Sequence, residues 1–311
     1  MARIISVMNY KGGVGKTTLA SNIGAELAYL GNNVLMIDLD PQSSLTFSFV
    51  TPDDWKTLLS DSKSIKNWFA IGANQEQDFR NLIVLPNKVN QMLKDQGKGS
   101  LSLIASHLDL INVDLELASE INGASRKQQR NSYFKVHAKL LKGIDTLEHI
   151  FDYIIIDCPP NFNIITKNAI VASHFVLVPA KPDYLSTLGI RYLKRNLIDL
   201  IDEYNHFCDE PSFETGEKFE KINPSILGVV FTMVQLYNGV PISVQRQYMR
   251  DVTRSDFPVF KSYMRENKTI FAEAPQYLLP VVLDKCGSRR DIVHEMENIV
   301  RELIEKITSK E

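Results

Sequence analysis

Short runs of apolar residues, separated by longer mixed stretches, recur along this chain. They lie at residues 3–8, 33–37, 152–157, 175–183 and 226–233, and the last two end near polar or proline-marked exits. Nearly continuous apolar runs are typical of strands that are buried on both faces of a parallel sheet. We therefore predict an α/β fold, a mostly parallel twisted sheet with helices on both faces.

Amphipathic segments between and after these runs predict the helices. Residues 17–30 follow the first strand and form a helical pattern that ends at Gly31. Residues 288–307 carry apolar side chains at helical spacing: Ile292, Met296, Ile299, Leu303 and Ile307. We expect this C-terminal helix to pack against the core.

The interval at about residues 53–145 is longer and less regular than the rest of the chain. It predicts short helices and strands at residues 55–70, 82–86 and 101–105, with a glycine-containing loop at 94–100. We interpret it as an elaboration of one domain that spans residues 1–311, and it could carry a partner-specific surface.

Composition narrows the class of protein only moderately. The chain has 311 residues, 44% of them apolar, and a net charge of −2, so any nucleic-acid surface must be a local patch. Cys158, Cys208 and Cys286 are far apart, which argues against a zinc site or a disulfide framework, and we expect Cys158 to be a small buried residue. The chain starts directly in a strand without a signal-peptide pattern, so we expect a cytoplasmic protein.

The glycine-rich segment between the first strand and the first helix carries the clearest chemistry. Gly12, Gly13 and Gly15 allow the backbone to turn its N–H groups toward an anion, next to the positive end of a helix. Lys16 would reach the outer phosphates, and the Thr17 hydroxyl would coordinate Mg²⁺. A chance glycine-rich turn is the alternative, but the strand, loop and helix occur in the order that a phosphate-binding loop requires.

The run Lys11-Gly12-Gly13-Val14-Gly15-Lys16-Thr17-Thr18 resembles the deviant Walker A loop of the ParA/MinD group of P-loop ATPases. The resemblance implies that the whole run binds ATP and that both Lys11 and Lys16 take part in catalysis. Lys11 would cross a dimer interface to the phosphates of the partner subunit, which couples ATP occupancy to dimerisation.

Three carboxylates follow predicted strands and would complete the site. Asp38 and Asp40 stand in a D-x-D-P-Q segment, and Asp157 ends the apolar run before Cys158-Pro159-Pro160. By the resemblance, Asp40 would orient or activate the attacking water, while Thr17, Asp38 and Asp157 would hold Mg²⁺, partly through water. Taken alone, the first segment could also be an ordinary strand-end turn.

The resemblance also implies an adenine site at the ends of the fourth and fifth strands. It would place Pro179 and Met233 near the base, although apolar residues at strand ends usually belong to the core. Residues 271–275 (Phe-Ala-Glu-Ala-Pro) resemble a family segment that lies near the nucleotide.

Basic residues near the C-terminal third suggest a DNA-binding surface. Arg246, Arg250 and Arg254 fall at i, i+4 and i+8 of a predicted helix, and Arg265 and Lys268 follow. Such a row suits sequence-independent phosphate contacts, or it is a solvated face offset by nearby aspartates. A second basic stretch from Arg126 to Lys142 is expected on an exposed helix.

MinD-like members of the group that this chain resembles bind membranes instead, through a basic C-terminal helix. Here the polar side of residues 288–307 holds Glu295, Glu297, Glu302 and Glu305, which anionic lipid would repel. We therefore expect no membrane contact.

Together these features predict an ATP-dependent homodimer of the ParA type with slow intrinsic ATP hydrolysis and Mg²⁺ as cofactor. It would bind DNA non-specifically, associate with the nucleoid in the ATP state, and move cargo through a ParB-like adaptor that stimulates hydrolysis. No helix-turn-helix domain precedes the first strand, so repression of its own operon by that route is not expected. The alternatives are a positioning or scaffold ATPase that acts through protein contacts and, more distantly, a metabolic kinase or synthetase.

Overall fold

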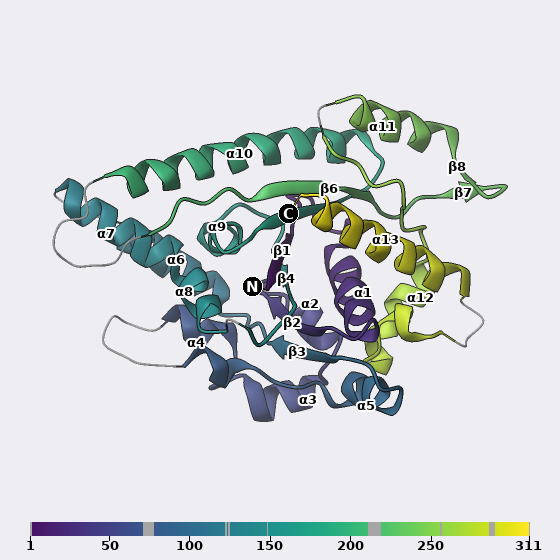
Figure 1. The fold of residues 1–311 in the computed structure, drawn as a ribbon, viewed down its shortest axis with the longest axis horizontal. Helices are drawn as coiled ribbons and strands as arrows, with labels where there is room; N and C mark the ends of the chain where they lie inside the picture. Colours follow the sequence, from purple (N-terminus) through teal and green to yellow (C-terminus); the bar gives the residue numbers. More distant parts are fainter. Residues whose placement is uncertain are drawn as a thin grey trace.

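A six-stranded parallel sheet forms the centre of the molecule (Figure 1). The computed structural model describes residues 2–70, 78–121, 123, 125–147, 149–210, 219–255, 257–285 and 290–310. The strands, in the spatial order β3-β2-β4-β1-β5-β6, are β1 (Arg3–Val7), β2 (Asn33–Asp38), β3 (Ser100–Ile104), β4 (Tyr153–Asp157), β5 (Phe175–Ala180) and β6 (Ser225–Phe231). Each neighbouring pair is parallel, which confirms the predicted fold class.

The strand order brings the predicted site together at one edge of the sheet. Because β4 lies between β1 and β2, Val7 and Asp38 both pair with Asp157. Strands β2 and β4 lie on one side of β1, and β5 lies on the other. In doubly wound sheets, ligands bind where the strand order reverses in this way. The carboxyl ends of these three strands therefore form the natural floor of a ligand site.

Helices cover both faces of the sheet. One face is covered by α1 (Lys16–Tyr29), α2 (Ser44–Phe47), α5 (Asn87–Asp95) and α13 (Arg290–Thr308). The other is covered by α4 (Ile65–Ala70), α6 (Leu110–Glu120), α7 (Arg126–His137), α8 (Lys139–Asp145), α9 (Ile164–Val171), α10 (Tyr184–Asp209) and α11 (Ser243–Thr253). In Figure 1 α1 and α13 lie on one side of β1 and β4, and α9 lies on the other.

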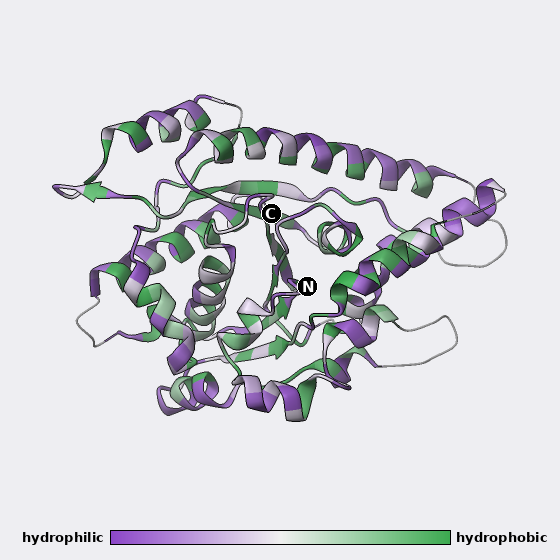
Figure 2. Cartoon of the chain, turned by 180° about the vertical axis from the view of Figure 1, so that it is seen from behind, coloured by the Kyte–Doolittle hydropathy of each residue, from purple (hydrophilic) through white to green (hydrophobic). Residues whose placement is uncertain are grey.

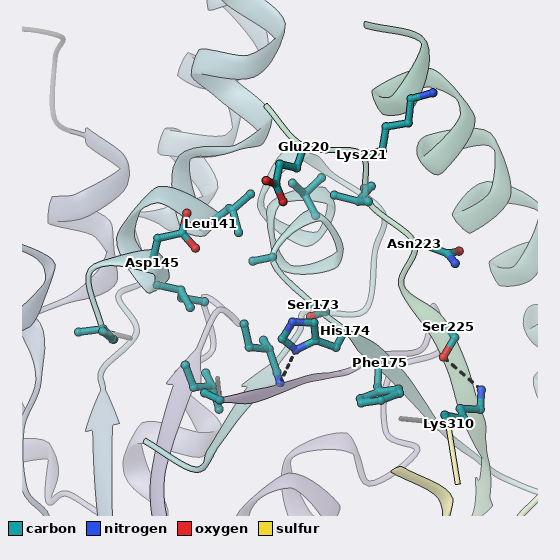
Figure 3. Close-up of a pocket in the computed structure, with 18 residues that line it drawn as sticks. Leu141, Asp145, Ser173, His174, Phe175, Glu220, Lys221, Asn223, Ser225 and Lys310 are labelled. Atoms are coloured by element: carbon teal, nitrogen blue, oxygen red, sulfur yellow. Dashed lines mark hydrogen bonds between the residues drawn. The ribbon is translucent and has the colours of Figure 1, made fainter. Parts of the chain in front are cut away.

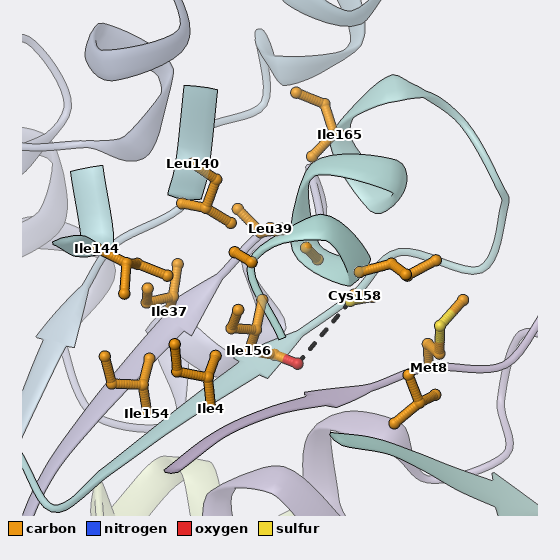
Figure 4. Close-up of a cluster of buried hydrophobic side chains, with 14 of the residues drawn as sticks. Ile4, Met8, Ile37, Leu39, Leu140, Ile144, Ile154, Ile156, Cys158 and Ile165 are labelled. Carbon is orange, nitrogen blue, oxygen red and sulfur yellow. Dashed lines mark hydrogen bonds between the residues drawn. The ribbon is translucent and has the colours of Figure 1, made fainter. Parts of the chain in front are cut away.

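Apolar side chains of the strands pack directly against these helices. Ile4 and Ile156 meet Leu140 and Ile144 of α8 in a fully apolar cluster (Figure 4). Cys158 lies in the same cluster and is completely buried, as expected for a small core residue. Figure 2 shows hydrophobic residues along the central strands, whereas they alternate with hydrophilic ones along α10.

The irregular interval contributes one strand and several short helices to this same core. The predicted run 101–105 forms β3, which pairs with β2 at the sheet edge. Residues 82–86 do not form a strand: they make a single bridge, Val84 to Leu103, after a 3-10 turn at Phe79–Leu82. The segment 55–70 is broken into a π-helical turn (Trp55–Leu59) and α4, preceded by the short α3 (Pro52–Asp54).

The C-terminal helix packs on the core, as the sequence predicts. Its five predicted apolar residues are all buried, and α13 contacts α1 and β6. Part of its acidic side is also occupied, because Glu302 accepts hydrogen bonds from the amides of Lys261 and Ser262. Within the described ranges, no helix is long and apolar enough to span a bilayer.

A small hairpin after β6 was not predicted. β7 (Leu236–Tyr237) and β8 (Val240–Pro241) pair antiparallel around Asn238 and Gly239, whose φ angles are 51° and 78°. Asn-Gly is the usual pair for such a two-residue turn, so the signal was present in the sequence. The hairpin projects beside α11 in Figure 1.

The predicted exposed basic stretch from Arg126 to Lys142 is confirmed for Arg126, Lys127, Lys135 and Lys142, whereas Arg130 is buried and Lys139 is half-buried. Arg130 is buried and donates to the carbonyl of Phe207 at 3.1 Å. Lys139 donates to the carbonyl of Phe69 at 2.6 Å, and the Lys142 ammonium lies 5.2 Å from the centre of the Phe219 ring. Long basic side chains here cover apolar surface and satisfy carbonyl groups.

Candidate nucleotide-binding site

The predicted phosphate-binding loop connects β1 to α1. Gly13 and Gly15 have φ angles of 67° and 77°, values that favour glycine and that form the turn into the helix. The Thr232 hydroxyl, at the end of β6, donates to the carbonyl of Val14 at 2.7 Å. The loop is therefore held from outside as well as by its own backbone.

A cavity of about 510 Å³ opens above this loop at the carboxyl edge of the sheet. Its lining combines the loop, α1, the segment after β2 and the C-terminal third of the chain: Gly12, Gly13, Gly15, Lys16, Thr17, Thr18, Ser21, Asn22, Asp40, Gln42, Ser44, Ser48, Pro160, Met233, Phe271, Ala274, Pro275, Leu279 and Pro280. This volume is in the range of small-ligand sites, with glycine backbone and charged groups at one end and apolar side chains at the other.

Lys16 extends into the loop. Only 7% of the residue is exposed, and its Nζ donates to the carbonyl of Lys11 at 3.3 Å. Burial lowers the pKa of Lys16, and the nearby Asp157 opposes this shift. A phosphate group that enters the loop would give this buried ammonium a charged hydrogen-bond partner.

Thr17 and Asp157 fit a Mg²⁺ site. The Thr17 hydroxyl donates to Asp157 Oδ2 at 2.7 Å, and Asp157 is completely buried. Its second oxygen, Oδ1, has no hydrogen-bond partner in the part of the chain that the structure describes. An uncompensated buried carboxylate oxygen beside a hydroxyl offers the oxygen ligands that Mg²⁺ prefers.

Asp38 is held by its own chain. Its Oδ2 accepts from the amide and the hydroxyl of Thr46 at 2.8 and 2.7 Å, and its Oδ1 accepts from the Asp40 amide at 3.1 Å. Burial raises the pKa of Asp38, and it also raises the pKa of the neighbouring Asp157. With both oxygens engaged, Asp38 is arranged to support the metal site and to shape the loop of Asp40, and its metal role stays a prediction.

Asp40 lines the same cavity as the phosphate-binding glycines. Its Oδ1 accepts from the Gln42 amide at 2.9 Å, and its carbonyl accepts from the Ser106 hydroxyl at 2.7 Å. The loop is thus fixed by the segment after β3, which belongs to the elaborated interval. Its role in orienting the attacking water stays a prediction.

Lys11 points to a different part of the chain. Its Nζ lies 2.7 Å from Asp183 Oδ2, at the start of α10. About a third of each side chain is exposed, 32% for Lys11 and 39% for Asp183. In this structure Lys11 is therefore engaged by a carboxylate of its own chain.

Of the two residues predicted to contact adenine, one lines the cavity, and the adenine contact itself stays a prediction. Met233 lines the cavity, with a φ angle of 53°, whereas Pro179 is not among the described lining residues. The carbonyl of Pro179 instead accepts from the Asn9 side chain at 2.6 Å. The predicted segment 271–275 contributes Phe271 and Pro275, and α12 (Lys268–Glu273) with the 3-10 turn at Ala274–Tyr277 positions them.

The five predicted DNA contacts separate into three groups. Arg246, Arg250 and Arg254 are exposed along α11. Arg265 is engaged by Glu295 and Asp291, at 2.6 and 2.5 Å, in contacts that the sequence spacing could not reveal. Lys268 is 88% exposed and lies apart, 3.7 Å from Glu266.

Basic residues of α10 were missed by the sequence prediction. Arg191 and Arg254 line one groove of about 410 Å³ between α10 and α11, together with Tyr184, Tyr248 and the acidic Asp251. Arg191 also lines the adjoining groove, with Lys194 and Arg195. The i, i+4 spacing of Arg191 and Arg195 was a readable signal, but only the fold shows that Arg191 faces α11.

A second cavity, of about 720 Å³, lies at the opposite edge of the sheet (Figure 3). Asp145, His174 and Glu220 project into it, and the amide of Ile4 donates to His174 Nδ1 at 3.1 Å. It is remote from the phosphate loop and shares no lining residue with the cavity there.

Comparison with known proteins agrees with this geometry. The model of a family described as an AAA domain matches residues 2–209, about two thirds of the chain. The sporulation initiation inhibitor protein Soj of Bacillus subtilis is 29% identical over 292 residues, which cover 93% of this chain and 94% of Soj. The chromosome partitioning protein ParA of Caulobacter vibrioides is 28% identical over 307 residues, covering 96% and 95%. The chain belongs to the ParA-type ATPases.

Solved structures show the same fold. Apo McdA from Cyanothece superposes with a TM-score of 0.69 at 20% identity, covering 98% of this chain and 100% of McdA. Cobyrinic acid a,c-diamide synthase from Mycobacterium smegmatis, solved with an ATP analog and magnesium, superposes with a TM-score of 0.63 at 25% identity, covering 94% and 98%. The cavity over the P-loop of this ATPase is accordingly its candidate ATP site.

Proposed function

We propose that this protein is an ATP-dependent dimerising ATPase that binds DNA without sequence preference and drives partition of a DNA or other cargo. The observation that carries the proposal is the P-loop itself, where two lysines, Lys11 and Lys16, flank the glycines beside the buried Asp157. Lys16 serves the phosphates of its own chain, and Lys11 is free to serve those of a second chain once it leaves Asp183.

The residues of the site have separate roles in hydrolysis. Backbone amides of the loop and Lys16 bind the phosphates, and Thr17 and Asp157 hold Mg²⁺, which neutralises phosphate charge when bound. Asp40 accepts a hydrogen bond from the attacking water and orients it. Asp38 accepts a hydrogen bond from the Asp40 amide and thereby holds the Asp40 carboxylate in position. Turnover is slow until a partner improves the alignment of the water.

The groove between α10 and α11, called the basic groove because Arg191 and Arg254 outnumber Asp251 in its lining, supports the DNA-binding part of the proposal. Arg191 and Arg254 face one groove from two helices, and Arg246 and Arg250 extend the row along α11. Guanidinium groups spaced along a groove contact backbone phosphates independently of sequence, with affinity that falls steeply with salt. A cargo-bound adaptor of the ParB type would then stimulate hydrolysis and release the DNA.

A DNA-shift assay with ATP, ADP or no nucleotide, across a salt series, tests this function. We expect binding with ATP and Mg²⁺ only, lost progressively as salt rises, and weakened about tenfold in Arg191→Ala and Arg254→Ala. Arg301→Ala is the matched control, because Arg301 is exposed on α13, away from the groove. Equal binding in all nucleotide states would contradict the proposal.

A positioning or scaffold role through protein contacts is the second candidate. The observation in its favour is an exposed apolar row, Leu108, Ile111 and Leu115, at helical spacing on and before α6, with 57%, 55% and 66% of each residue exposed. This row belongs to the elaborated interval. Absence of DNA binding at low salt, together with loss of a protein partner in Ile111→Asp, would favour this candidate.

A further inference from the structure

The contact between Lys11 and Asp183 joins the phosphate loop to the start of α10. The backbone of Lys11 is tied to the same region, because its amide donates to Asn9 Oδ1 at 3.0 Å and the Asn9 side chain donates to the carbonyl of Pro179. Main chain and side chain of Lys11 are thus both anchored toward the end of β5. The ion pair spans 172 positions of sequence.

Asp183 uses its two carboxylate oxygens for different purposes. Oδ1 accepts from the Ser186 amide at 2.8 Å and caps the N-terminus of α10, whereas Oδ2 takes the Lys11 ammonium at 2.7 Å. Burial raises the pKa of Asp183, but the hydrogen bonds from Lys11 and Ser186 outweigh it, so the net pKa is lowered. The carboxylate is therefore ionised at neutral pH.

We propose that Asp183 is a positioning residue that holds Lys11 in cis and must release it before Lys11 can reach the ATP of a second copy. The inference rests on the proposed function, since it needs an ATP-dependent dimer. An ion pair whose side chains are each about a third exposed is weak, which suits this role: it biases the nucleotide-free chain toward the monomer without locking it there. Asp183 also begins the helix that carries Arg191, so release occurs at the base of the basic groove.

Asp183→Asn separates the two purposes of this side chain. Asparagine caps helices as well as aspartate does, so α10 keeps its N-cap, while the charge that attracts Lys11 is removed. Asp199→Asn is the matched control: it removes one negative charge from the same helix at an exposed position that pairs only loosely with Arg195, at 3.9 Å. Both variants should unfold within about 2 °C of the wild type.

The first measurement tests the contact itself in the full-length, nucleotide-free protein. Lysines are acetylated briefly with an amine-reactive ester, and the rate at Lys11 is read by mass spectrometry of the digest. We expect Lys11 to react about two- to fivefold faster in Asp183→Asn and at the wild-type rate in Asp199→Asn. Equal rates at Lys11 in the wild type and Asp183→Asn would overturn the inference.

The second measurement tests the consequence. ATP is titrated with Mg²⁺ and dimer formation is followed by light scattering, in an Asp40→Ala background that suppresses hydrolysis. We expect half-maximal dimerisation of Asp183→Asn at about two- to fivefold less ATP than the Asp40→Ala parent or the Asp199→Asn control requires. A normal dimer with unchanged ATP dependence overturns the inference alone. No dimer in any variant overturns the proposed function and, with it, this inference.

Discussion

The Thr232 hydroxyl donates a hydrogen bond to the carbonyl of Val14 across 218 positions of sequence. Thr232 directly follows β6, the strand at one edge of the sheet, and Val14 lies in the middle of the phosphate loop. Both residues are fully buried. The bond therefore fixes the loop to the rigid sheet, and it does so beside Gly15, where an added Cβ would lie 3.1 Å from Met264 Cε.

Thr232→Val should weaken ATP binding more than it weakens the fold. Valine keeps the volume but leaves the Val14 carbonyl without this partner, at a cost of about 1–2 kcal/mol. Part of that cost falls on loop preorganisation, so we expect ATP affinity to fall about threefold to tenfold in a fluorescent-nucleotide titration. Thr57→Val, at an exposed helical position, should bind ATP normally. Unchanged affinity in Thr232→Val would show that the loop is set by its own backbone.

Lys16 and Asp40, which both line the nucleotide cavity, should give opposite phenotypes when replaced by alanine. Lys16→Ala removes the buried ammonium from the loop, so ATP affinity should fall about 100-fold and no dimer should form. Asp40→Ala leaves the loop intact, so ATP should bind within about threefold of the wild-type affinity while hydrolysis slows about 100-fold. ATP would then hold the dimer together.

Sedimentation with ATP and Mg²⁺ distinguishes these outcomes. Asp40→Ala should sediment as a stable dimer and Lys16→Ala as a monomer, with Lys88→Ala, an exposed lysine on α5, behaving as the wild type. An Asp40→Ala chain that stays monomeric with saturating ATP is incompatible with the mechanism.

Much of the site was predictable because its chemistry is local in sequence. The loop from Lys11 to Thr18 and the carboxylates at strand ends could be placed at one sheet edge because each follows a strand that was predicted to lie in a parallel sheet. What escaped prediction depends on distant pairs: Arg265 with Glu295, or the facing of Arg191 toward Arg254. No periodicity reveals such partners, because they are set by how helices pack across the sheet rather than by either segment.

The elaborated interval at about residues 53–145 shows a second limit of prediction from sequence. Its strand at β3 was predicted because five consecutive residues favour a buried strand, but residues 82–86 were not separable from a strand by pattern. They meet β3 through one bridge only, after which Pro86 starts α5. Where an element is this short, tertiary packing rather than propensity decides its form.

Lys285→Met should destabilise the fold through a buried carboxylate. Lys285 Nζ lies 2.5 Å from Glu26 Oε2 on α1 and 2.8 Å from Glu297 Oε1 on α13, and the Glu26 side chain is only 5% exposed. Removing the lysine leaves Glu26 buried without its cation, so we expect a loss of about 3 kcal/mol in the free energy of unfolding at pH 7.5. Urea denaturation measures it.

The pH dependence of the stability loss and a second substitution test whether the buried Glu26 carboxylate is its cause. Burial already raises the pKa of Glu26, so the unpaired carboxyl in Lys285→Met should take up a proton readily, and the loss should shrink at pH 5. Adding Glu26→Gln should recover most of the stability. A double variant as unstable as Lys285→Met would assign the effect to lost packing against Tyr29, whose ring centre lies 4.4 Å from the ammonium.

His137 should make the fold sensitive to mild acid. Its residue is 2% exposed, its Nδ1 is 3.1 Å from the carbonyl of Tyr133, and its ring stacks on Tyr133 with centroids 4.1 Å apart. Burial lowers the pKa of His137 to about 4 from an ordinary value of 6.5. At a pH between these two pKa values, His137 is protonated in the unfolded chain but neutral in the folded chain. The free energy of unfolding should therefore fall by up to about 3 kcal/mol as pH drops from 6.5 to 4.

Urea denaturation at several pH values isolates this contribution by comparing slopes rather than absolute stabilities. His137→Gln retains an N–H donor for the Tyr133 carbonyl but cannot titrate, so its stability should fall less steeply than the wild type between pH 6.5 and 4. His206→Gln, which removes an exposed histidine from α10, is the matched control and should keep the wild-type slope. If His137→Gln and the wild type lose stability in parallel, the acid sensitivity arises from carboxylates instead, and His137 must be able to protonate within the folded core.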